Sequence, residues 1–399
     1  MKSSPFLAAS LSSLAAWAVL LAGRGGFWRA RPDAHVCAAP RDLRTLRVEA
    51  VVPARDEAET IGRAIASLVG QRFAGRLAVT LVDDGSADGT AVLARAAALP
   101  LRDAHPLEVI PGRALPPGWS GKLSALATGT AHVLERRGAP DYWLFCDADI
   151  AHDPHNVAAL ARTALADDLD LVSLMVLLRC ESGWERLLVP AFVFFFAKLY
   201  PFAWANDPRR RTAAAAGGCI LLSHDAFERI GGFVAIRHAL IDDCALAAAV
   251  KRGGGRTWLG LTARTHSLRR YDDLATFRAM VARTAFAQLQ HRYALVGVAA
   301  AGLALLYLVP PVAALAGLVR RDRTLAAAGL LGWIAMAVAY APTLRLYRRP
   351  SYEALGLPVA AALYGAMTVE SAAAYARKRG GRWKGRTYEA TSPEAATIA

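Results

Sequence analysis

Two aspartates separated by one small residue, Asp147 and Asp149, follow an apolar run over residues 142–146. We predict that this run is a buried strand that carries both acids to its C-terminal end, at the edge of a crevice. Two carboxylates placed there are hard oxygen ligands, which Mg²⁺ and Mn²⁺ bind together with substrate phosphates. A strand that simply ends in a polar turn would show the same pattern, so other segments must decide between the two interpretations.

Two earlier segments also place acids after apolar runs. Glu57 lies just beyond the strand predicted over residues 48–52, and Asp84 lies just beyond the strand predicted over residues 77–82. Ligand sites of open α/β sheets gather at the carboxyl ends of strands, so both acids can face a substrate. Their oxygens can accept hydrogen bonds from a base N–H or from ribose hydroxyls. Acids in a first helical turn, or ordinary turn chemistry, would explain each segment by itself.

The elements that must position these acids alternate between short apolar runs and amphipathic segments from about residue 48 to residue 271. This pattern is typical of an α/β fold with a largely parallel sheet. We predict strands over residues 48–52, 77–82, 107–110, 142–146 and 171–178, and helices over residues 60–69, 91–99, 123–134 and 244–251. Ser86 or Asp88 offers an N-cap to the helix over residues 91–99.

Two further segments could do chemistry at helix N-termini. Lys122 ends the sequence Gly-Trp-Ser-Gly-Lys before the helix predicted over residues 123–134. Its ammonium and the free backbone N–H groups there suit a diphosphate, although a solvated lysine after a turn is more common. Asp242 and Asp243 precede the helix predicted over residues 244–251, where they could also act only as helix caps.

These segments, in this order, resemble the family 2 inverting glycosyltransferases, which have the GT-A fold. The resemblance covers residues 48–283 and rests on residues 51–58, 83–90, 147–149 and 241–246. It implies an α/β, Rossmann-like catalytic domain with a mostly parallel sheet. It also implies a nucleotide-diphosphate sugar as donor, with UDP the expected nucleotide, and Mg²⁺ or Mn²⁺ as cofactor.

The resemblance implies a role for each matching residue. The expected donor-binding residues are Pro53, Glu57, Asp84, Lys122, Asp147 and Arg283, and the expected metal ligands are Asp147 and Asp149. Asp243 matches the usual general base, which takes the proton of the acceptor hydroxyl as the alcohol attacks the anomeric carbon. Its neighbour Asp242, the other catalytic candidate, could raise the pKa of Asp243 by like-charge repulsion.

Finer resemblances concern the acceptor. Residues 118–122 are similar to the corresponding segment of the ceramide glucosyltransferases, and residues 280–286 to the hopene-associated glycosyltransferases. The family's Gln-x-x-Arg-Trp motif is reduced here to Arg283, and its missing tryptophan argues against a processive polysaccharide synthase. The resemblance therefore implies a lipid hydroxyl as acceptor, in triterpenoid (hopanoid) lipid metabolism. A polyprenyl phosphate as acceptor, or a nucleotide-sugar-binding membrane protein without catalysis, are the alternatives.

Composition points to a membrane and against nucleic acid. The net charge is +14 and 55% of the residues are hydrophobic, and the arginines cluster beside apolar stretches, as juxtamembrane residues do. Four stretches are candidate spans: residues 6–22, 293–319, 325–341 and 355–374. Basic residues follow each of them, so the side of the C-terminus stays open, and Pro310-Pro311 must kink or break its stretch or form a re-entrant hairpin.

These observations predict the organisation of the chain. We expect an N-terminal membrane anchor (residues 1–30), a GT-A domain (residues 45–285), a transmembrane region (residues 293–376) and a basic, then disordered, tail (residues 377–399). Within the GT-A domain, residues 187–205 are predicted to be an interfacial segment, with a buried core helix as the alternative. Five cysteines without paired spacing indicate a reducing compartment. The expected location is a bacterial-type inner (cytoplasmic) membrane, with several spans and the catalytic domain facing the cytoplasm.

Overall fold

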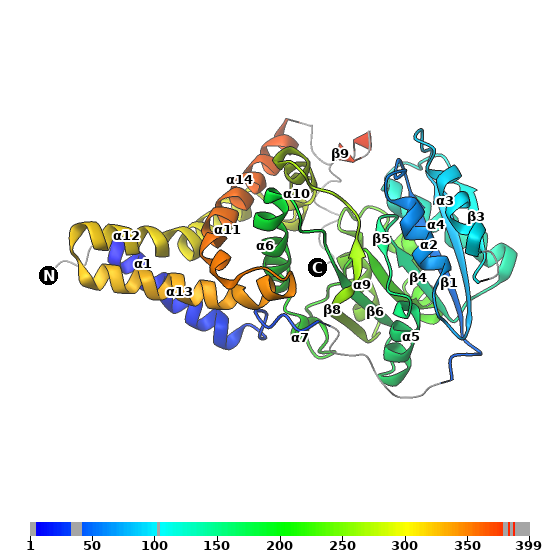
Figure 1. The fold of residues 1–399 in the computed structure, drawn as a ribbon, viewed down its shortest axis with the longest axis horizontal. Coiled ribbons are helices and arrows are strands. Elements are labelled where there is room, and N and C mark those ends of the chain that lie inside the picture. Colours follow the sequence, from blue (N-terminus) through cyan, green and yellow to red (C-terminus); the bar gives the residue numbers. More distant parts are fainter. Residues whose placement is uncertain (1–4, 33–41, 102–103, 378–381, 384–385, 388–399) are drawn as a thin grey trace. The chain divides into compact units, whose positions relative to one another are not determined.

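The computed structural model describes residues 5–32, 42–101, 104–377, 382–383 and 386–387. The predicted disordered tail lies largely outside these residues. The chain divides into two compact units (Figure 1). One contains residues 31–179 and 204–270 and is called the sheet unit below. The other contains residues 1–30, 180–203 and 271–399 and is called the helical unit.

The sheet unit is built on an eight-stranded sheet with the strand order β3-β2-β1-β4-β7-β6-β8-β5. Its strands are β1 (Arg47–Ala54), β2 (Arg76–Asp83), β3 (Leu107–Pro111), β4 (Tyr142–Cys146), β5 (Ile150–Ala151), β6 (Leu171–Leu177), β7 (Cys219–Ser223) and β8 (Thr257–Ser267). Strands β3, β2, β1 and β4 are parallel, as are β6 and β8, whereas β7 is antiparallel to both of its neighbours. The predicted mostly parallel sheet is confirmed.

Both faces of this sheet are covered by helices, which explains why its strands are almost continuously apolar. The helices are α2 (Ile61–Val69), α3 (Thr90–Ala98), α4 (Gly121–Arg137), α5 (Asn156–Ala166), α8 (His224–Arg229) and α9 (Asp242–Arg252). Successive residues of β4 alternate between two cores: Leu144 and Cys146 pack with α2 and α5, and Trp143 and Phe145 pack with α4 and α9.

The strand register brings several strand ends to one edge of the sheet. Ala54 at the end of β1 pairs with Asp83 at the end of β2, and Cys146 at the end of β4 pairs with Cys219 at the start of β7. The antiparallel direction of β7 therefore brings the glycines before it, at positions 217 and 218, to the edge where the parallel strands finish. This edge collects the loops that carry the predicted site residues.

The five predicted strands are confirmed, and so are four predicted helices within one to three residues at each end. Strands β5, β7 and β8 were not predicted from the sequence. The predicted cap of α3 was wrong, because the N-cap residue is Gly89, in the left-handed region at φ 87°, and no side chain caps it. Asp88 instead accepts hydrogen bonds from the N–H and hydroxyl of Thr90, in the first turn.

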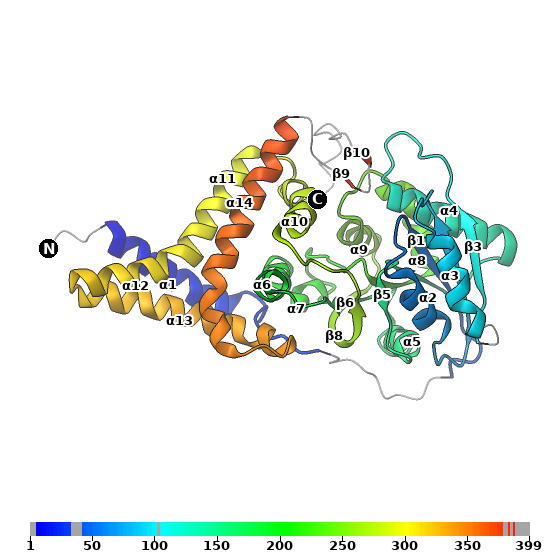
Figure 2. The same cartoon turned by 45° about the horizontal axis from the view of Figure 1, so that its top comes forward.

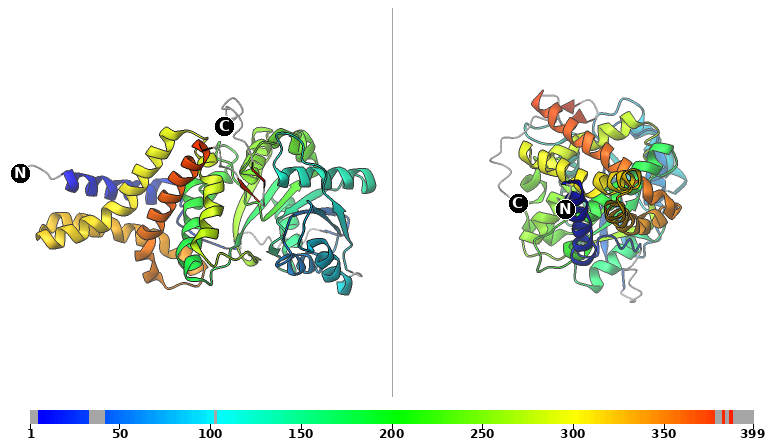
Figure 3. Two further views of the ribbon diagram at one scale, coloured as in Figure 1. Left: turned by 90° about the horizontal axis from the view of Figure 1, so that it is seen from above. Right: turned by 90° about the vertical axis from the view of Figure 1, so that its left-hand side faces the viewer.

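The helical unit is built mainly of helices (Figures 2 and 3). They are α1 (Pro5–Gly23), α6 (Gly183–Leu199), α10 (Leu274–Gln288), α11 (Tyr293–Leu303), α12 (Val309–Arg320), α13 (Arg323–Leu346) and α14 (Leu357–Ala376). Within the described part of the chain, four helical segments are long and apolar enough to cross a membrane: Pro5–Gly23, Tyr293–Arg320, Arg323–Leu346 and Ser351–Ala376. Helix α6 runs through Pro190 and Lys198 and ends before Pro201.

Helices α12 and α13 form a tight helical hairpin that also packs on α1. A Cβ atom at Gly317 would lie 2.3 Å from the backbone nitrogen of Ala326, and one at Gly329 would lie 2.3 Å from that of Ala314. Glycine at both positions therefore lets the two backbones approach closely. A π-helical turn over Ala304–Leu308 joins α11 to α12 just before Pro310-Pro311, where the sequence predicted an irregularity.

Candidate functional site

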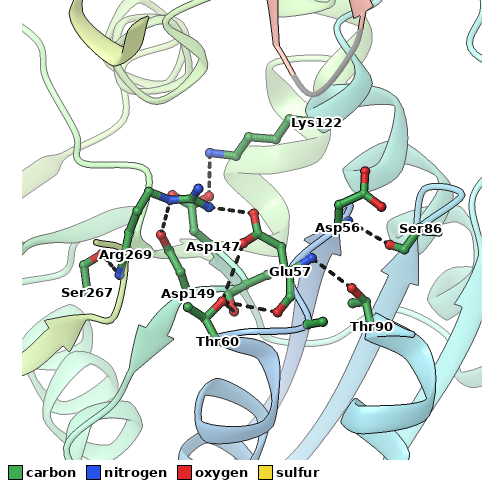
Figure 4. Close-up of polar contacts among 12 residues, drawn as sticks. Asp56, Glu57, Thr60, Ser86, Thr90, Lys122, Asp147, Asp149, Ser267 and Arg269 are labelled. Carbon is green, nitrogen blue, oxygen red and sulfur yellow. Dashed lines mark hydrogen bonds and ion pairs between the residues drawn. The ribbon is translucent and has the colours of Figure 1, made fainter. Parts of the chain in front are cut away.

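The loops after β1 and β2 are joined by hydrogen bonds from backbone N–H groups. The N–H of Glu57 donates to Oγ1 of Thr90 over 2.8 Å, and the N–H of Asp56 donates to the Ser86 hydroxyl over 2.9 Å. Asp56 adopts a positive φ of 49°, which is uncommon for a residue with a side chain. These contacts fix the loop that carries Glu57 at the strand edge (Figure 4).

Asp84 is buried, with only 7% of its surface exposed. Its backbone N–H donates to the carbonyl of Ala54, and its own carbonyl accepts a hydrogen bond from Nη1 of Arg55 over 2.5 Å. A Cβ atom at Gly112 would lie 3.0 Å from its Cα. Asp84 is therefore held at the edge of the sheet, between the ends of β1 and β3.

Arg269 connects Glu57 with Asp149. Its Nε donates to Oδ2 of Asp149 over 2.7 Å, and its Nη2 donates to Oε1 of Glu57 over 2.6 Å (Figure 4). Arg269 follows β8, which runs parallel to β6 and ends at the same edge of the sheet. Arg269 was not among the site residues predicted from the sequence. Its position two residues after β8 would have indicated a place at the strand edge, but only if β8 had been recognised as a strand.

Lys122 connects Asp147 with Asp242. Its Nζ lies 2.8 Å from Oδ1 of Asp147 and 3.0 Å from Oδ2 of Asp242. Ser120 caps α4 by accepting from the N–H of Leu123, so Lys122 occupies the first turn of that helix. Burial alone would lower the pKa of Lys122, but Asp147 and then Asp242 outweigh it and raise that pKa. The side chain is a permanent cation between the two acidic pairs.

Asp243 lies in the first turn of α9 and accepts two backbone hydrogen bonds. Oδ2 accepts from the N–H of Gly217 over 2.8 Å, and Oδ1 accepts from the N–H of Cys244 over 2.7 Å. The N-cap residue of α9 is Ile241, so Asp242 and Asp243 are first-turn residues rather than caps. Burial raises the pKa of Asp243 to about 6, and the charge of Asp242 adds to this effect. The predicted direction of the Asp242 effect is confirmed, although burial contributes more.

A small cavity opens beside Asp243. Its polar lining consists of Lys122, Asp242, Asp243 and the backbone at Gly217, and its apolar lining consists of Leu123, Leu126, Phe145, Cys146, Ile220, Phe233 and Leu246. The ammonium of Lys122 and the carboxylates of Asp242 and Asp243 thus border the same cavity as a group of apolar side chains. The enclosed space is about that of one water molecule, so it can seat a single hydroxyl group against the Asp243 carboxyl group.

The donor set around Asp147 and Asp149 fits a hard divalent cation. Each carboxylate already places one oxygen within 2.8 Å of a cationic nitrogen. Burial raises the pKa of Asp147 and the charge of Asp149 adds to this effect. Together they outweigh Lys122, which lowers the same pKa. No group of three or more His, Cys, Asp or Glu side chains arranged for a metal occurs among the described residues. Phosphate oxygens and waters would have to complete the coordination, as is usual for Mg²⁺.

Two predicted donor-binding residues, Pro53 and Arg283, lie within a strand and a helix rather than in the loops at the sheet edge. Pro53 is on β1, in register with Val82 of β2, and is half-buried. Arg283 lies on α10 in the helical unit, so its contact with a diphosphate stays a prediction. The remaining predicted residues all lie in the sheet unit. Lys122 contacts Asp147 and Asp242, and Arg269 joins Glu57 to Asp149. Asp243 borders the same cavity as Lys122 and Asp242.

Comparison with known proteins identifies the class of this domain. Residues 49–231 match the family model described as Glycosyl transferase family 2. The chain therefore contains a family 2 glycosyltransferase domain, and its mostly parallel sheet with helices on both faces is the predicted GT-A fold. No curated protein matches the chain.

Several solved structures are similar to the chain. One is the mannosyltransferase PcManGT from Pyrobaculum calidifontis in complex with GDP-Man and Mn²⁺, which is 19% identical, with a TM-score of 0.47 over 92% of this chain and 98% of that chain. Another is glucosyl-3-phosphoglycerate synthase from Mycobacterium tuberculosis in complex with Mg²⁺ and UDP. It is 17% identical, with a TM-score of 0.39 over 69% of this chain and 83% of that chain.

Proposed function

We propose that this protein is a membrane-bound inverting glycosyltransferase that moves a sugar from a nucleotide-diphosphate sugar, with UDP as the expected nucleotide, to a lipid hydroxyl. The acceptor that we infer is a polycyclic triterpenoid (hopanoid) lipid, on the resemblance of residues 280–286 to the hopene-associated glycosyltransferases. The observation that carries the proposal is Asp243: a half-buried carboxyl group, with its pKa raised to about 6, that borders a cavity beside Lys122.

The geometry supports a direct displacement at the anomeric carbon. Asp243 accepts the proton of the acceptor hydroxyl while the hydroxyl oxygen forms the new bond to the anomeric carbon. The bond from the sugar to the diphosphate breaks on the opposite face. The Gly217 and Cys244 N–H groups hold both carboxyl oxygens and orient the base. Lys122 supplies a positive charge for the departing diphosphate. A divalent cation bound by Asp147 and Asp149 would supply further positive charge there.

A raised pKa at Asp243 favours a hydroxyl over a phosphate as the acceptor group. A hydroxyl must lose its proton during attack, and a base with a pKa near the working pH performs this transfer efficiently. A polyprenyl phosphate already carries a negative oxygen and would gain little from such a base. We therefore rank the polyprenyl-phosphate reaction, and binding without catalysis, below transfer to a hydroxyl.

Four membrane-length helices and their basic flanks support the membrane part of the proposal. Arg24, Arg29 and Arg31 follow the first of these helices, α1. Because positive flanks stay on the cytoplasmic side, we infer a multi-pass protein of a bacterial-type inner membrane. The sheet unit would then face the cytoplasm.

Lipid mass spectrometry tests the proposed function. We expect lipid extracts of cells that carry the gene to contain a species heavier by one hexose or hexosamine than its counterpart in cells without the gene. Cells that carry the gene with Asp243→Asn should resemble the deletion. A product that is a polyprenyl phosphate sugar would overturn the hydroxyl acceptor. Bound UDP-sugar with no lipid change and no hydrolysis would instead show a binding protein.

The pH dependence of transfer follows from the state of Asp243. The base works only when deprotonated, so kcat/KM should rise about tenfold per pH unit below the pKa and level off above it. Because the pKa of Asp243 is raised to about 6, the midpoint should lie near pH 6. The measurement is kcat/KM for a soluble acceptor analogue between pH 5 and 8. A flat profile through this range would contradict the assignment.

Gly217 lies beside both Asp243 and Lys122. A Cβ atom there would lie 3.0 Å from Nζ of Lys122 and 3.4 Å from Oδ2 of Asp243. Gly217→Ala should therefore lower kcat on the order of 10- to 100-fold, because the added methyl group displaces the Lys122 ammonium and fills space beside the Asp243 carboxylate. Gly62→Ala is the control, since its Cβ atom would meet only Ala97 at 3.9 Å. Equal kcat values for the two variants would contradict this role of Gly217.

A further inference from the structure

The guanidinium of Arg269 occupies a position between two subsites with different proposed ligands. Glu57 is expected to contact the nucleoside, and Asp149 is expected to bind the metal, yet one side chain holds both carboxylates within 2.7 Å. Glu57 and Asp149 have side chains that are only 10% and 9% exposed. Their negative charges are therefore poorly solvated, and the guanidinium stabilises them where water cannot.

The backbone around Arg269 is fixed rather than loosely placed. The N–H of Leu268 donates to the carbonyl of Asp149 over 2.7 Å, and β5 pairs with β8 through Ile150 and Ser267. The N–H of Arg269 donates to Oγ of Ser267 over 3.3 Å. The segment that carries the arginine is thus bonded to the segment that carries the aspartate. The side chain of Arg269 is 36% exposed, so its guanidinium is accessible from solvent.

We propose that Arg269 is a positioning residue that holds the metal-free donor site together and couples metal binding to nucleotide binding. The proposal rests on the proposed function for the identity of the two ligands. A divalent cation at Asp149 must either share this carboxylate with the Arg269 guanidinium or displace the guanidinium from it. Two cations at one carboxylate repel each other. Arg269 therefore lowers the affinity of the site for a metal ion alone.

A bound nucleoside diphosphate changes this balance. Its phosphate oxygens offer the guanidinium a bidentate anionic partner, so Arg269 can leave Asp149 without losing a counter-charge. The carboxylate is then free for the metal ion. Metal and nucleotide consequently favour each other's binding, and the coupling is reciprocal. Lys122 could act in the same sense at Asp147, but it also contacts Asp242, so its substitution would mix coupling with catalysis.

Manganese titrations of the full-length protein in detergent test the proposal without an activity assay. The readout is free Mn²⁺ measured by electron paramagnetic resonance, first alone and then with saturating UDP or GDP. Arg269→Ala should bind Mn²⁺ alone roughly 5- to 150-fold more tightly than the wild type. The gain in Mn²⁺ affinity caused by the nucleotide should shrink by a similar factor.

A matched control stands next in the chain. Arg270 lies 3.8 Å from Glu59, and both side chains are more than half exposed. Arg270→Ala removes the same charge from the same segment, and its Mn²⁺ titrations should equal those of the wild type. Arg269→Lys keeps the charge but lacks the fork that bridges two carboxylates. It should give Mn²⁺ affinities between those of the wild type and Arg269→Ala, and it decides the question if the alanine variant does not fold.

Unchanged or weaker Mn²⁺ binding by folded Arg269→Ala would overturn the proposal, as would a nucleotide effect equal to that of the wild type. A wild type that binds no Mn²⁺ with or without nucleotide would overturn it too. Failure of the proposed function looks different. It would appear as an absence of sugar transfer to any lipid while the titrations still show coupled binding.

Discussion

Asp243→Asn is expected to reduce sugar transfer about 10²- to 10⁴-fold, the usual contribution of a general base. Asparagine keeps the shape of the side chain, but its amide nitrogen accepts no proton at neutral pH. The carboxylate contacts only the Gly217 and Cys244 N–H groups and faces the cavity, and it makes no ion pair among the described residues. Donor binding should therefore remain nearly intact. Single-turnover transfer and calorimetric binding of UDP-sugar measure the two quantities.

A comparison with Asp242→Asn makes the result specific. Burial and the charge of Asp242 both raise the pKa of Asp243, so removal of Asp242 should shift the midpoint of the pH profile below about 6. Asp243→Asn should therefore lose turnover at every pH, whereas Asp242→Asn should shift the pH at which kcat/KM rises. Purified Asp243→Asn enzyme with wild-type turnover would remove this residue from the base role.

Lys122→Met is expected to lower transfer by about 10²- to 10³-fold, in the range found when one preorganised charge or donor is removed from a reacting site. Lys122 lies within 3.0 Å of both Asp147 and Asp242, so its loss also leaves these acids without a counter-charge. The same charge lowers the pKa of Asp243, against the effects of burial and of Asp242. Its removal should therefore move the midpoint of the pH profile above about 6.

Lys122→Arg is the matched control, because it retains the positive charge while changing the shape of the donor. Its pH midpoint should stay close to that of the wild type even where its turnover is reduced. The measurement is the pH profile of kcat/KM for all three proteins. A Lys122→Met profile with an unshifted midpoint would show that Lys122 does not act on Asp243, whatever its effect on turnover.

Much of the fold could be predicted from local sequence patterns. The strands β1, β2, β3, β4 and β6 are short apolar runs with polar segments on either side, and their type depends on neighbouring residues alone. Strand β7 escaped prediction because its short apolar run, unlike that of β4, contains no aromatic residue to favour a strand over a buried helix segment. Strand β8 escaped because its outer half, Thr-Ala-Arg-Thr-His-Ser, alternates polar side chains with small or polar ones.

The acids of the site could be named in advance for a related reason. Glu57, Asp84, Asp147 and Asp149 follow predicted parallel strands, and parallel strands of one sheet finish at one edge. Asp243 was found by its resemblance to a family motif and not by a strand end. The antiparallel β7 then places Gly217 beside it, which no local pattern indicates.

The sequence by itself determined which residues are acidic, which segments are buried strands, and in which order they occur. Only the tertiary structure decided which cation stands at which acid: Lys122 between Asp147 and Asp242, and Arg269 between Asp149 and Glu57. Glu57 and Arg269 are 212 residues apart in the chain, so no helical or strand period relates them. Their contact depends on the order and direction of strands in the sheet, which only the packing of the whole domain fixes.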